Sequence, residues 1–220
     1  MAGSALASHD SGGSRVYFIG NDNHVHELAW ADQQGQWVWN TTDLTATAKD
    51  ANDNAPPSAI ADSALASHDS GGSRVYFIGK DPTSGDDHVY EIAWLGSIWN
   101  YTPLTTVTGA PSAIAGSALA SHDSGGSRVY FIGNDNHVHE LAWANQQGQW
   151  LWNTTDLTSV ARDIHSNPPP PAIAGSALTS HNTSADPGGA GCTLSVATIT
   201  ATITCTRSPG RCRLVGTPPT

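Results

Sequence analysis

Three copies of one segment dominate this sequence and limit the folds that it can adopt. The copies run from Ser14 to Trp30, from Ser73 to Trp94 and, almost letter for letter, from Ser127 to Trp143. Each carries Arg-Val-Tyr-Phe-Ile-Gly, then a polar stretch, then a second apolar run that ends in Trp. Aromatic and β-branched residues on both sides of a polar turn predict two short strands joined as a hairpin.

Two further strands are predicted in each unit. Small residues ending in Asp-Ser-Gly-Gly precede the hairpin and predict an inner strand with a turn. A Trp-rich segment follows the hairpin and predicts an outer strand, as at residues 37–44. Successive units begin roughly 50 to 60 residues apart and differ in length only in their loops. Four strands per unit indicate β-propeller blades, because solenoid repeats are shorter and sandwiches need more strands.

The predicted fold class is therefore all-β, a partial β-propeller of three complete four-stranded blades plus a degenerate fourth. We expect blade 1 with its linker at residues 1–61 and blade 2 at residues 62–115. Blade 3 with its linker is expected at residues 116–174, and residues 175–220 begin a fourth blade.

The last segment loses the repeat pattern after its first strand. Codons for Arg-Val-Tyr-Phe-Ile-Gly read one base late can spell Gly-Cys-Thr-Leu-Ser-Val, the sequence of residues 191–196. We hypothesise that the chain from about Thr183 is a fourth blade translated out of frame, or a disordered tail. The alternative is a genuine extension in which residues 198–204 form a strand. All three cysteines lie in this segment, so they are not interpreted as a metal or disulfide signature.

Charge and hydropathy exclude several classes of partner. The chain has 9 Lys and Arg against 19 Asp and Glu, with a formal net charge of −10. This balance argues against nucleic acid or an acidic membrane surface as a partner. No apolar run approaches the roughly 20 residues of a membrane span. No secretory leader follows Met1, as expected of a fragment, although a secreted or extracellular location is favoured.

An arginine and a glutamate recur together on adjacent strands of every complete unit. The pairs are Arg15 and Glu27, Arg74 and Glu91, and Arg128 and Glu140. A guanidinium offers a rigid fork of donors and a carboxylate only acceptors, so together they can bind neighbouring hydroxyls of a sugar. The alternative is a cross-strand salt bridge with a structural role.

Tryptophans favour the sugar-binding interpretation. Each unit has a Trp three residues after its Glu and another across the next loop: Trp30 and Trp37, Trp94 and Trp99, Trp143 and Trp150. Indole faces can stack on the apolar face of a pyranose. The alternative is that the rings fill the gaps between blades, which we expect of Trp39 and Trp152.

The repeats resemble the fucose-binding lectins of fungi and bacteria that are six-bladed β-propellers, the Aleuria aurantia lectin type. The resemblance covers residues 3 to about 160 and depends on Arg-Val-Tyr, a Glu about twelve residues after the Arg, a Trp three residues after that Glu, and Gly-x-Trp. The second unit departs from this spacing because its hairpin is longer. The Ser-His-Asp and Asp-Leu-Thr motifs are also unlike the fungal members.

The resemblance implies that each sugar lies between two blades, with Arg and Glu from one blade and tryptophans from the next. The implied sites are Arg15 and Glu27 with Trp94 and Trp99, and Arg74 and Glu91 with Trp143 and Trp150. Arg128 and Glu140 would lack a partner, because the next blade is the degenerate one.

Two other motifs contain residues that are common in catalytic or metal sites, but neither is assigned such a function. Ser8-His9-Asp10 has the letters of a catalytic triad, but consecutive strand residues point to opposite faces and cannot form a relay. His24-x-His26 and its copy at residues 137–139 could hold Zn²⁺. No third ligand is evident and the second unit has His88 and Tyr90, so no metal site is predicted.

The sequence therefore predicts a multivalent carbohydrate-binding module that recognises fucose-like sugars and is not an enzyme. The expected partners are glycans or glycoconjugates, no cofactor is expected, and copies of the chain could associate to complete a propeller ring. The alternatives are a protein–protein interaction propeller and a non-catalytic domain of a larger secreted protein. A glycosidase is disfavoured because it needs paired carboxylates roughly 5 to 10 Å apart.

Overall fold

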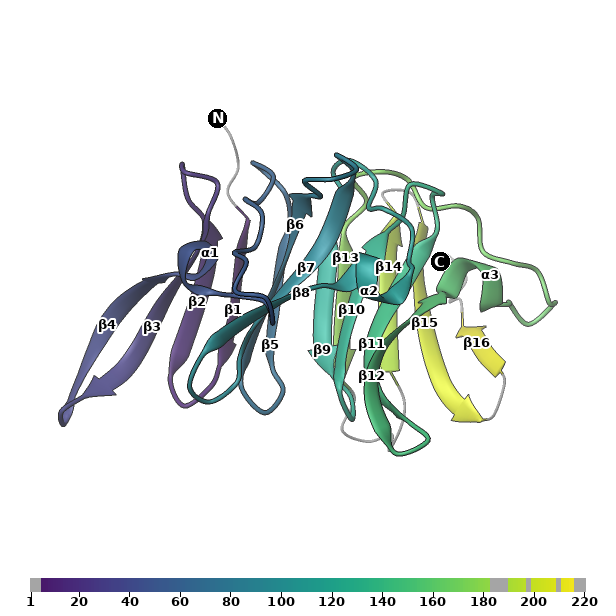
Figure 1. Ribbon diagram of the computed structural model, residues 1–220. Coiled ribbons are helices and arrows are strands. Elements are labelled where there is room, and N and C mark those ends of the chain that lie inside the picture. The colour runs from purple at the N-terminus through teal and green to yellow at the C-terminus, as the bar shows by residue number, and fades with distance from the viewer. Residues whose placement is uncertain (1–4, 183–189, 197–198, 209–210, 216–220) are drawn as a thin grey trace.

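The computed structural model describes residues 5–182, 190–196, 199–208 and 211–215, with the last three segments as backbone. The chain forms four antiparallel four-stranded sheets that stand side by side in chain order, from the purple N-terminal sheet to the yellow C-terminal one (Figure 1). Within each sheet the strands follow one another in sequence order. The predicted all-β fold of four-stranded blades is confirmed. We call the sheets blades 1 to 4 and the interfaces between successive blades seams 1 to 3.

Each of the first three blades ends in a short helix. Blade 1 contains β1 (Leu6–Asp10), β2 (Ser14–Ile19), β3 (Val25–Gln33) and β4 (Gln36–Asp43), followed by α1 (Leu44–Thr47). Blade 2 contains β5 (Leu65–Asp69), β6 (Ser73–Lys80), β7 (Asp87–Trp94) and β8 (Trp99–Pro103), followed by α2 (Leu104–Thr108). Blade 3 contains β9 (Leu119–Asp123), β10 (Ser127–Ile132), β11 (Val138–Gln146) and β12 (Gln149–Asp156), followed by α3 (Leu157–Val160). None of the described helices has the length or apolarity needed to cross a bilayer.

The outer strand of blade 1 ends earlier than the sequence pattern predicts. It ends at Asp43, whose side chain accepts a hydrogen bond from Ala46 N and so caps α1. Asp156 caps α3 in the same way, whereas Pro103 begins α2 without a side-chain cap. Asp is a favoured N-cap because its carboxylate satisfies a backbone N–H that the first turn leaves free. The Asp-Leu-Thr motif is therefore a helix start.

Blade 4 contains β13 (Leu178–Asn182), β14 (Ala190–Val196), β15 (Ile199–Ser208) and β16 (Arg211–Val215). The backbone of the degenerate segment therefore completes a fourth sheet. Its register pairs Gly191 with His181, as Arg128 pairs with His122 in blade 3. Gly191 thus stands at the arginine position of the repeat, where a one-base shift would place it. The out-of-frame origin of this segment stays a prediction that the coding DNA tests.

The inner strands of the four blades gather around a common channel. β1 lies beside β5, β5 beside β9, and β9 beside β13. The Leu-Ala-Ser segments of the first three inner strands and Leu178–Ser180 of the fourth line this channel. Small residues at these positions let the strands approach one another, as the sequence predicts.

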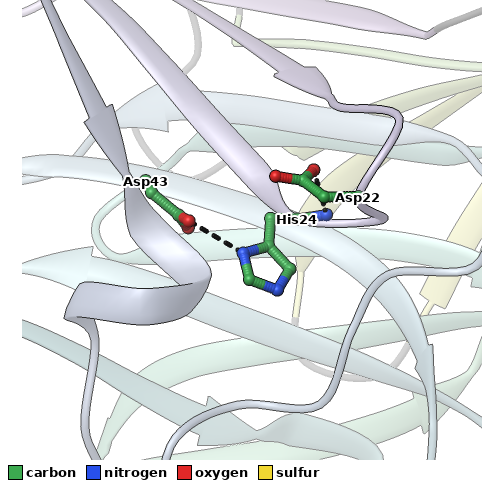
Figure 2. Close-up of side chains that lie close together, drawn as sticks. All are labelled: Asp22, His24 and Asp43. Carbon is green, nitrogen blue, oxygen red and sulfur yellow. Dashed lines mark hydrogen bonds and ion pairs between the residues drawn. The ribbon is translucent and has the colours of Figure 1, made fainter.

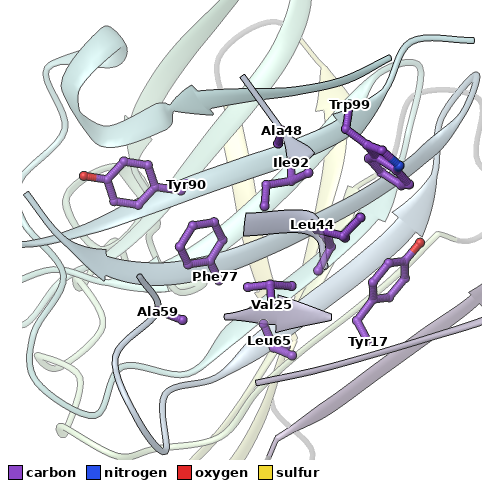
Figure 3. Packing of buried hydrophobic residues seen from close by; sticks show 11 residues of the cluster. Tyr17, Val25, Leu44, Ala48, Ala59, Leu65, Phe77, Tyr90, Ile92 and Trp99 are labelled. Carbon is purple, nitrogen blue, oxygen red and sulfur yellow. The ribbon is translucent and has the colours of Figure 1, made fainter. Parts of the chain in front are cut away.

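The hydrophobic core lies in the seams. At seam 1, Tyr17, Val25 and Leu44 of the first blade pack against Phe77 and Ile92 of the second (Figure 3). Seams 2 and 3 contain corresponding clusters. Each blade therefore buries one face against the blade before it and the other against the blade after it.

Blade 1 is the exception, because no blade in this chain precedes it. Leu6 is 70% exposed, whereas Leu65 and Leu119, which hold the same position in blades 2 and 3, are each 7% exposed. Leu28 is 37% exposed, and its counterpart Leu141 is completely buried. We call this uncovered side of blade 1 the leading face.

Candidate functional site

In every complete blade the structure brings the predicted arginine and glutamate together. Their ion pairs join the two central strands, with Arg Nη1 to Glu Oε1 distances of 3.1 Å for Arg15 and Glu27, 2.8 Å for Arg74 and Glu91, and 3.6 Å for Arg128 and Glu140. The side chains of Glu27 and Glu91 are each 4% exposed, and that of Glu140 is 16% exposed. The pair is tightest and most enclosed in blade 2.

A tyrosine from the same strand as the arginine also holds each carboxylate. Tyr17 and Tyr76 donate to the Oε1 atoms of Glu27 and Glu91, each at 3.1 Å. Tyr130 instead donates to Oε2 of Glu140 at 2.9 Å. These tyrosines belong to the Arg-Val-Tyr motif, but no role was predicted for them from the sequence. A buried Tyr hydroxyl needs a partner, and the neighbouring Glu is the signal that could have identified it.

Burial and charge set the ionisation of the blade 2 group. Burial raises the pKa of Glu91, and the adjacent Arg74 and Tyr76 oppose that rise. Burial also raises the pKa of Tyr76 well above its usual value, and the charge of Glu91 adds to this effect. Tyr76 therefore keeps its proton and serves as a donor. Arg74 and Glu91 form an ion pair because each charge compensates the desolvation of the other.

At seam 2 this group opens onto an aromatic cavity. Ser70, Gly71 and Arg74 of blade 2 line it together with Gly126, Trp143 and Trp150 of blade 3. The cavity has a volume of about 460 Å³, and the rings of Trp143 and Trp150 stack with centroids 6.4 Å apart. The structure therefore brings Arg74 from one blade and both expected tryptophans from the next to a single seam.

The donors and acceptors of this cavity are only partly used by the protein. Arg74 donates through Nε to the carbonyl of Ser70 at 3.2 Å and through Nη1 to Glu91. Both bonds to the Glu91 carboxylate reach Oε1. Within the part of the chain that the structure describes, Arg74 Nη2 and Glu91 Oε2 have no hydrogen-bond partner. Arg74, which lines the cavity, thus has a donor group available to a ligand hydroxyl. Glu91 does not line the cavity, but one of its carboxylate oxygens is not used by the protein.

Seam 1 is arranged differently from the expectation. Trp94 pairs with Trp99 across β7 and β8, just as Trp30 pairs with Trp39 and Trp143 with Trp152. Trp99 therefore corresponds to Trp39 and Trp152, not to the second tryptophan of the seam 2 cavity. It is only 8% exposed and packs in the seam 1 core (Figure 3).

The grouping of Trp99 with Trp37 and Trp150 was wrong because the outer hairpin of blade 2 is shorter. β7 ends at Trp94, whereas β3 and β11 continue beyond the corresponding Trp30 and Trp143. Blade 2 thus has no residue at the position of Trp37 in the ladder. At seam 1, Trp94 packs against the cluster that contains Tyr17, the tyrosine that donates to Glu27. The role of Arg15, Glu27 and Trp94 in binding stays a prediction.

Seam 3 presents Arg128 and Glu140 to blade 4. The register places Gly191 and Thr202 of blade 4 at the positions that Arg128 and Glu140 occupy in blade 3. Blade 4 therefore carries neither member of the pair at its own equivalent positions.

A second aromatic cavity, which the sequence interpretation missed, lies on the leading face of blade 1. It is lined by Asp10, Gly12, Gly13, Ser14, Trp30 and Trp37. Its stacked indoles, 6.3 Å apart, correspond to Trp143 and Trp150 of the seam 2 cavity. It has the tryptophan half of a seam site, and no preceding blade of this chain supplies the arginine half.

Histidines and aspartates cluster at the other end of the blades. Figure 2 shows His24 between Asp22 and Asp43, with His24 Nδ1 2.8 Å from Asp43 Oδ2. A related cluster in blade 3 contains Asp135, Asp156 and His139, the counterpart of His26. Their carboxylates also accept backbone N–H groups, as Asp22 does from His24 N and Asp43 does from Ala46 N. Turn and helix-cap contacts account for these clusters, and we assign no ligand to them.

The Ser-His-Asp motif lies on the inner strands and forms no triad. Its His9, His68 and His122 rings stack on Tyr17, Tyr76 and Tyr130, with centroids 5.4 to 5.6 Å apart. Its Asp residues accept hydrogen bonds from the Gly-Gly turn, as Asp123 does from Gly126 N at 3.2 Å. The motif is architectural, as the sequence interpretation holds, and it places a histidine behind each tyrosine.

Several solved lectin structures have folds similar to this one. AofleA from Arthrobotrys oligospora matches with a TM-score of 0.61 and 19% identity, over 97% of this chain and 56% of that chain. The SapL1 lectin in complex with α-methyl fucoside matches with a TM-score of 0.56 and 20% identity, over 99% and 65%. The six-bladed β-propeller lectin from Aleuria aurantia matches with a TM-score of 0.54 and 17% identity, over 91% and 58%. The chain thus spans between 56% and 65% of the length of these proteins.

Sequence comparison gives the family directly. A comparison with curated proteins finds no significant match. The sequence model of the fungal fucose-specific lectins, in contrast, matches residues 2–187, which include the three complete blades and the start of the fourth. The chain belongs to the family of fungal fucose-specific lectins.

Proposed function

We propose that this protein binds fucose-containing glycans in the seams between its blades. The observation that carries the proposal is the seam 2 cavity, where Arg74 of blade 2 faces the same space as Trp143 and Trp150 of blade 3. Membership of the fucose-specific lectin family supports fucose as the sugar. Two structures of similar fold contain α-methyl fucoside or Fucα1-6GlcNAc, which makes methyl α-L-fucoside a suitable probe.

The unused groups of the cavity match the chemistry of a deoxy sugar. Arg74 Nη2 can donate to a ring or hydroxyl oxygen, and Glu91 Oε2 can accept from a neighbouring hydroxyl. The indoles of Trp143 and Trp150 can cover an apolar C–H face, including a methyl group. The Glu91 carboxylate is already ionised and held by two donors. It therefore needs no rearrangement to accept a hydrogen bond from a hydroxyl of the ligand. The site is therefore largely preformed, which lowers the cost of binding.

Repetition of the unit makes the protein multivalent. Arg15 and Glu27 with Trp94 form a second, less aromatic site at seam 1, and Arg128 and Glu140 supply the arginine half of a third. Shallow sites bind single sugars weakly, but simultaneous engagement can raise avidity by about 10²- to 10⁴-fold. We therefore expect surfaces densely covered with fucosylated glycans to be retained far more strongly than the free monosaccharide.

We propose that the site binds sugars without hydrolysing them and that the protein is not an enzyme. A glycosidase of the usual kind needs two carboxyl groups that flank one bond. The sequence contains three glutamates, and each is held in an ion pair with an arginine of its own blade. An ion-paired carboxylate that accepts two hydrogen bonds is suited to hold the hydroxyls of a ligand.

We further propose that copies of the chain associate through the leading face of blade 1. This face repeats the apolar positions that blades 2 and 3 bury against a preceding blade, including Leu6 and Leu28. It also carries Trp30 and Trp37, the half-site that lacks an arginine. A neighbouring copy would cover the apolar surface and bring the assembly closer to a closed ring.

The test of sugar binding is a titration of the protein with methyl α-L-fucoside, together with a glycan array. Arg74→Ala and Trp143→Ala should each weaken binding at seam 2 by about tenfold or more, since each removes a contact worth about 1.5 kcal/mol or more. Trp39→Ala is the matched control, because Trp39 is 54% exposed and does not line either aromatic cavity. An array on which no glycan is bound would refute the proposal and favour a protein-interaction propeller.

A further inference from the structure

A chain of polar side chains crosses seam 2 behind the sugar site. His68 of blade 2 stacks on Tyr76, with ring centroids 5.4 Å apart, and its Nε2 lies 3.1 Å from Oγ of Ser127. Ser127 belongs to blade 3 and is completely buried. Its hydroxyl lies close enough to the Tyr76 hydroxyl to oppose the rise that burial causes in the pKa of Tyr76, as a donor to the tyrosine oxygen would. Tyr76 in turn bonds Glu91 Oε1 at 3.1 Å. A residue of the next blade is therefore connected to the carboxylate of this one.

Counting protons fixes the direction of every bond in this chain. Ionised Glu91 can only accept hydrogen bonds, so the Tyr76 hydroxyl must use its single hydrogen to donate to the Glu91 carboxylate. The Tyr76 oxygen can then only accept from Ser127, and the Ser127 oxygen can only accept from His68. His68 must therefore carry its proton on Nε2. All three donors point along one path that ends at the negative charge of Glu91, the arrangement in which successive hydrogen bonds strengthen one another.

We propose that Ser127 is a positioning residue for the seam 2 sugar site, acting through Tyr76 on Glu91. This inference rests on the proposed function, since it assigns the carboxylate a ligand. Ser127 follows Gly126 of the cavity wall in the chain but does not itself line the cavity. It holds the Tyr76 hydroxyl in place, and Tyr76 keeps Oε1 of Glu91 engaged with Arg74, which leaves Oε2 for the sugar. The site is thus assembled only when blade 3 docks on blade 2.

Seams 1 and 2 differ in a way that supports this role. Seam 2 has the complete chain, and its ion pair is the shorter, at 2.8 Å. At seam 1, Ser73 makes the corresponding contact with Tyr17, but both ring nitrogens of His9 are buried without a partner in the described part of the chain. The ion pair there measures 3.1 Å.

The leading face supplies a matched serine that lies in no seam of its own chain, so it serves as a control in samples dilute enough to be monomeric. Ser14 occupies in blade 1 the position of Ser73 and Ser127, at the start of the arginine strand. It is exposed, because no blade of this chain precedes it. Ser14→Ala therefore makes the same chemical change as Ser127→Ala without touching a tyrosine–glutamate pair.

Glutamate labelling gives a direct and site-specific test. The sequence contains three glutamates, so carboxyl-¹³C labelling yields three signals, which Glu→Gln variants assign. Each signal reports both the pKa of its own carboxylate and the arrival of methyl α-L-fucoside beside it. The charged and titratable groups around Glu91 are Arg74, Tyr76 and His68, with Asp123 and His122 from blade 3. None of these is altered in Ser127→Ala.

Ser127→Ala should raise the pKa of Glu91, leave that of Glu27 unchanged, and weaken methyl fucoside binding at seam 2 by about three- to tenfold, as expected for one hydrogen bond. The acid limb of binding at seam 2, which is the pH range over which affinity for the fucoside falls on acidification, should move to higher pH. Tyr76→Phe should do the same more strongly, and Ser14→Ala should do neither. Denaturation midpoints show whether each variant is folded. If Ser127→Ala does not fold, Tyr76→Phe provides the measurement in its place.

The possible outcomes separate the two proposals. If the Glu91 pKa and the affinity of seam 2 are the same in Ser127→Ala as in the unaltered protein, the positioning role is overturned. An affinity that falls while the pKa and the acid limb stay fixed also overturns it, because the serine would then act only through packing. If the unaltered protein binds no fucoside, the proposed function fails. A Glu91 pKa that still responds to Ser127→Ala would, in that case, uphold the coupling across the seam by itself.

Discussion

At the scale of single residues, the seams keep three histidines neutral. Burial, together with the charge of Arg74, lowers the pKa of His68 to about 3. Burial and Arg128 lower the pKa of His122 to about 4, and burial also lowers that of His9. Each ring stacks on a tyrosine that holds a site glutamate. The residues that position the ligand-binding carboxylates are thus ones that acid would disturb.

Stability should therefore fall as the pH drops from about 7 to 5. The folded-state pKa values of these histidines lie below the unfolded value of about 6.5, so the unfolded chain binds more protons in this range. The stabilisation is complete above about pH 6.5 and is lost as the pH falls toward 4. At pH 5 each such histidine costs up to about 2 kcal/mol of unfolding free energy relative to pH 7.5. Urea denaturation at several pH values measures this slope.

Substitution of one histidine tests whether the buried histidines cause this loss of stability at low pH. His122→Phe keeps a ring against Tyr130 but cannot titrate, so the pH slope should decrease by about one proton. His165→Gln is the control, because His165 is exposed on the linker after α3. A slope that is the same in His122→Phe as in the unaltered protein would contradict this assignment.

At the scale of elements, the turn between the inner strand and the arginine strand shapes the cavity. Gly125 and Gly126 both have positive φ, at 62° and 132°. A Cβ on Gly125 would meet open space, whereas one on Gly126 would lie 2.1 Å from the Trp143 carbonyl oxygen and 3.1 Å from the Trp150 ring. The second glycine therefore allows the turn to approach the tryptophans.

This pair of glycines provides a matched test of the cavity wall. Gly125→Ala should cost about 1 to 2 kcal/mol of stability from backbone strain alone and leave sugar binding at seam 2 intact. Gly126→Ala should cost more, because the Trp143 carbonyl must move, and should weaken methyl fucoside binding at the same seam. Denaturation and titration of the two variants measure both effects. Equal affinities in the two variants would show that the turn does not shape the site.

The elements also show how far the sequence alone could lead. Repetition with loop-confined length changes predicts the four-stranded blades, and the Arg and Glu spacing predicts a pair on adjacent strands. Trp99 was misplaced because counting along the chain ignores a shortened hairpin, which changes the register partner. Ser127 went unrecognised because its role depends on contacts across a seam, with His68 and Tyr76 of the preceding blade. Sequence periodicity describes one blade, whereas these contacts join two.

At the scale of the whole molecule, the leading face is the main irregularity. Leu28 and Leu141 occupy the same register position, opposite Val16 and Val129. One lies on the uncovered side of blade 1 and the other in the seam 2 core. A stable propeller buries such positions in every blade, so the two residues compare a covered with an uncovered face in one chain.

The comparison predicts a dependence on protein concentration. Leu141→Ala should cost about 2 to 5 kcal/mol at any concentration, because it leaves a cavity in the core. In dilute solution Leu28→Ala should cost less than about 1 kcal/mol, because little apolar surface is lost from a half-open site. As the concentration rises and copies cover the leading face, the cost of Leu28→Ala should approach that of Leu141→Ala, since association stabilises the bound form by mass action. Urea denaturation across a hundredfold range of concentration, with light scattering of the same samples, measures this change. A Leu28→Ala cost that stays small at every concentration, in samples that scatter as monomers, would show that the face remains uncovered and that copies of this chain do not complete the ring.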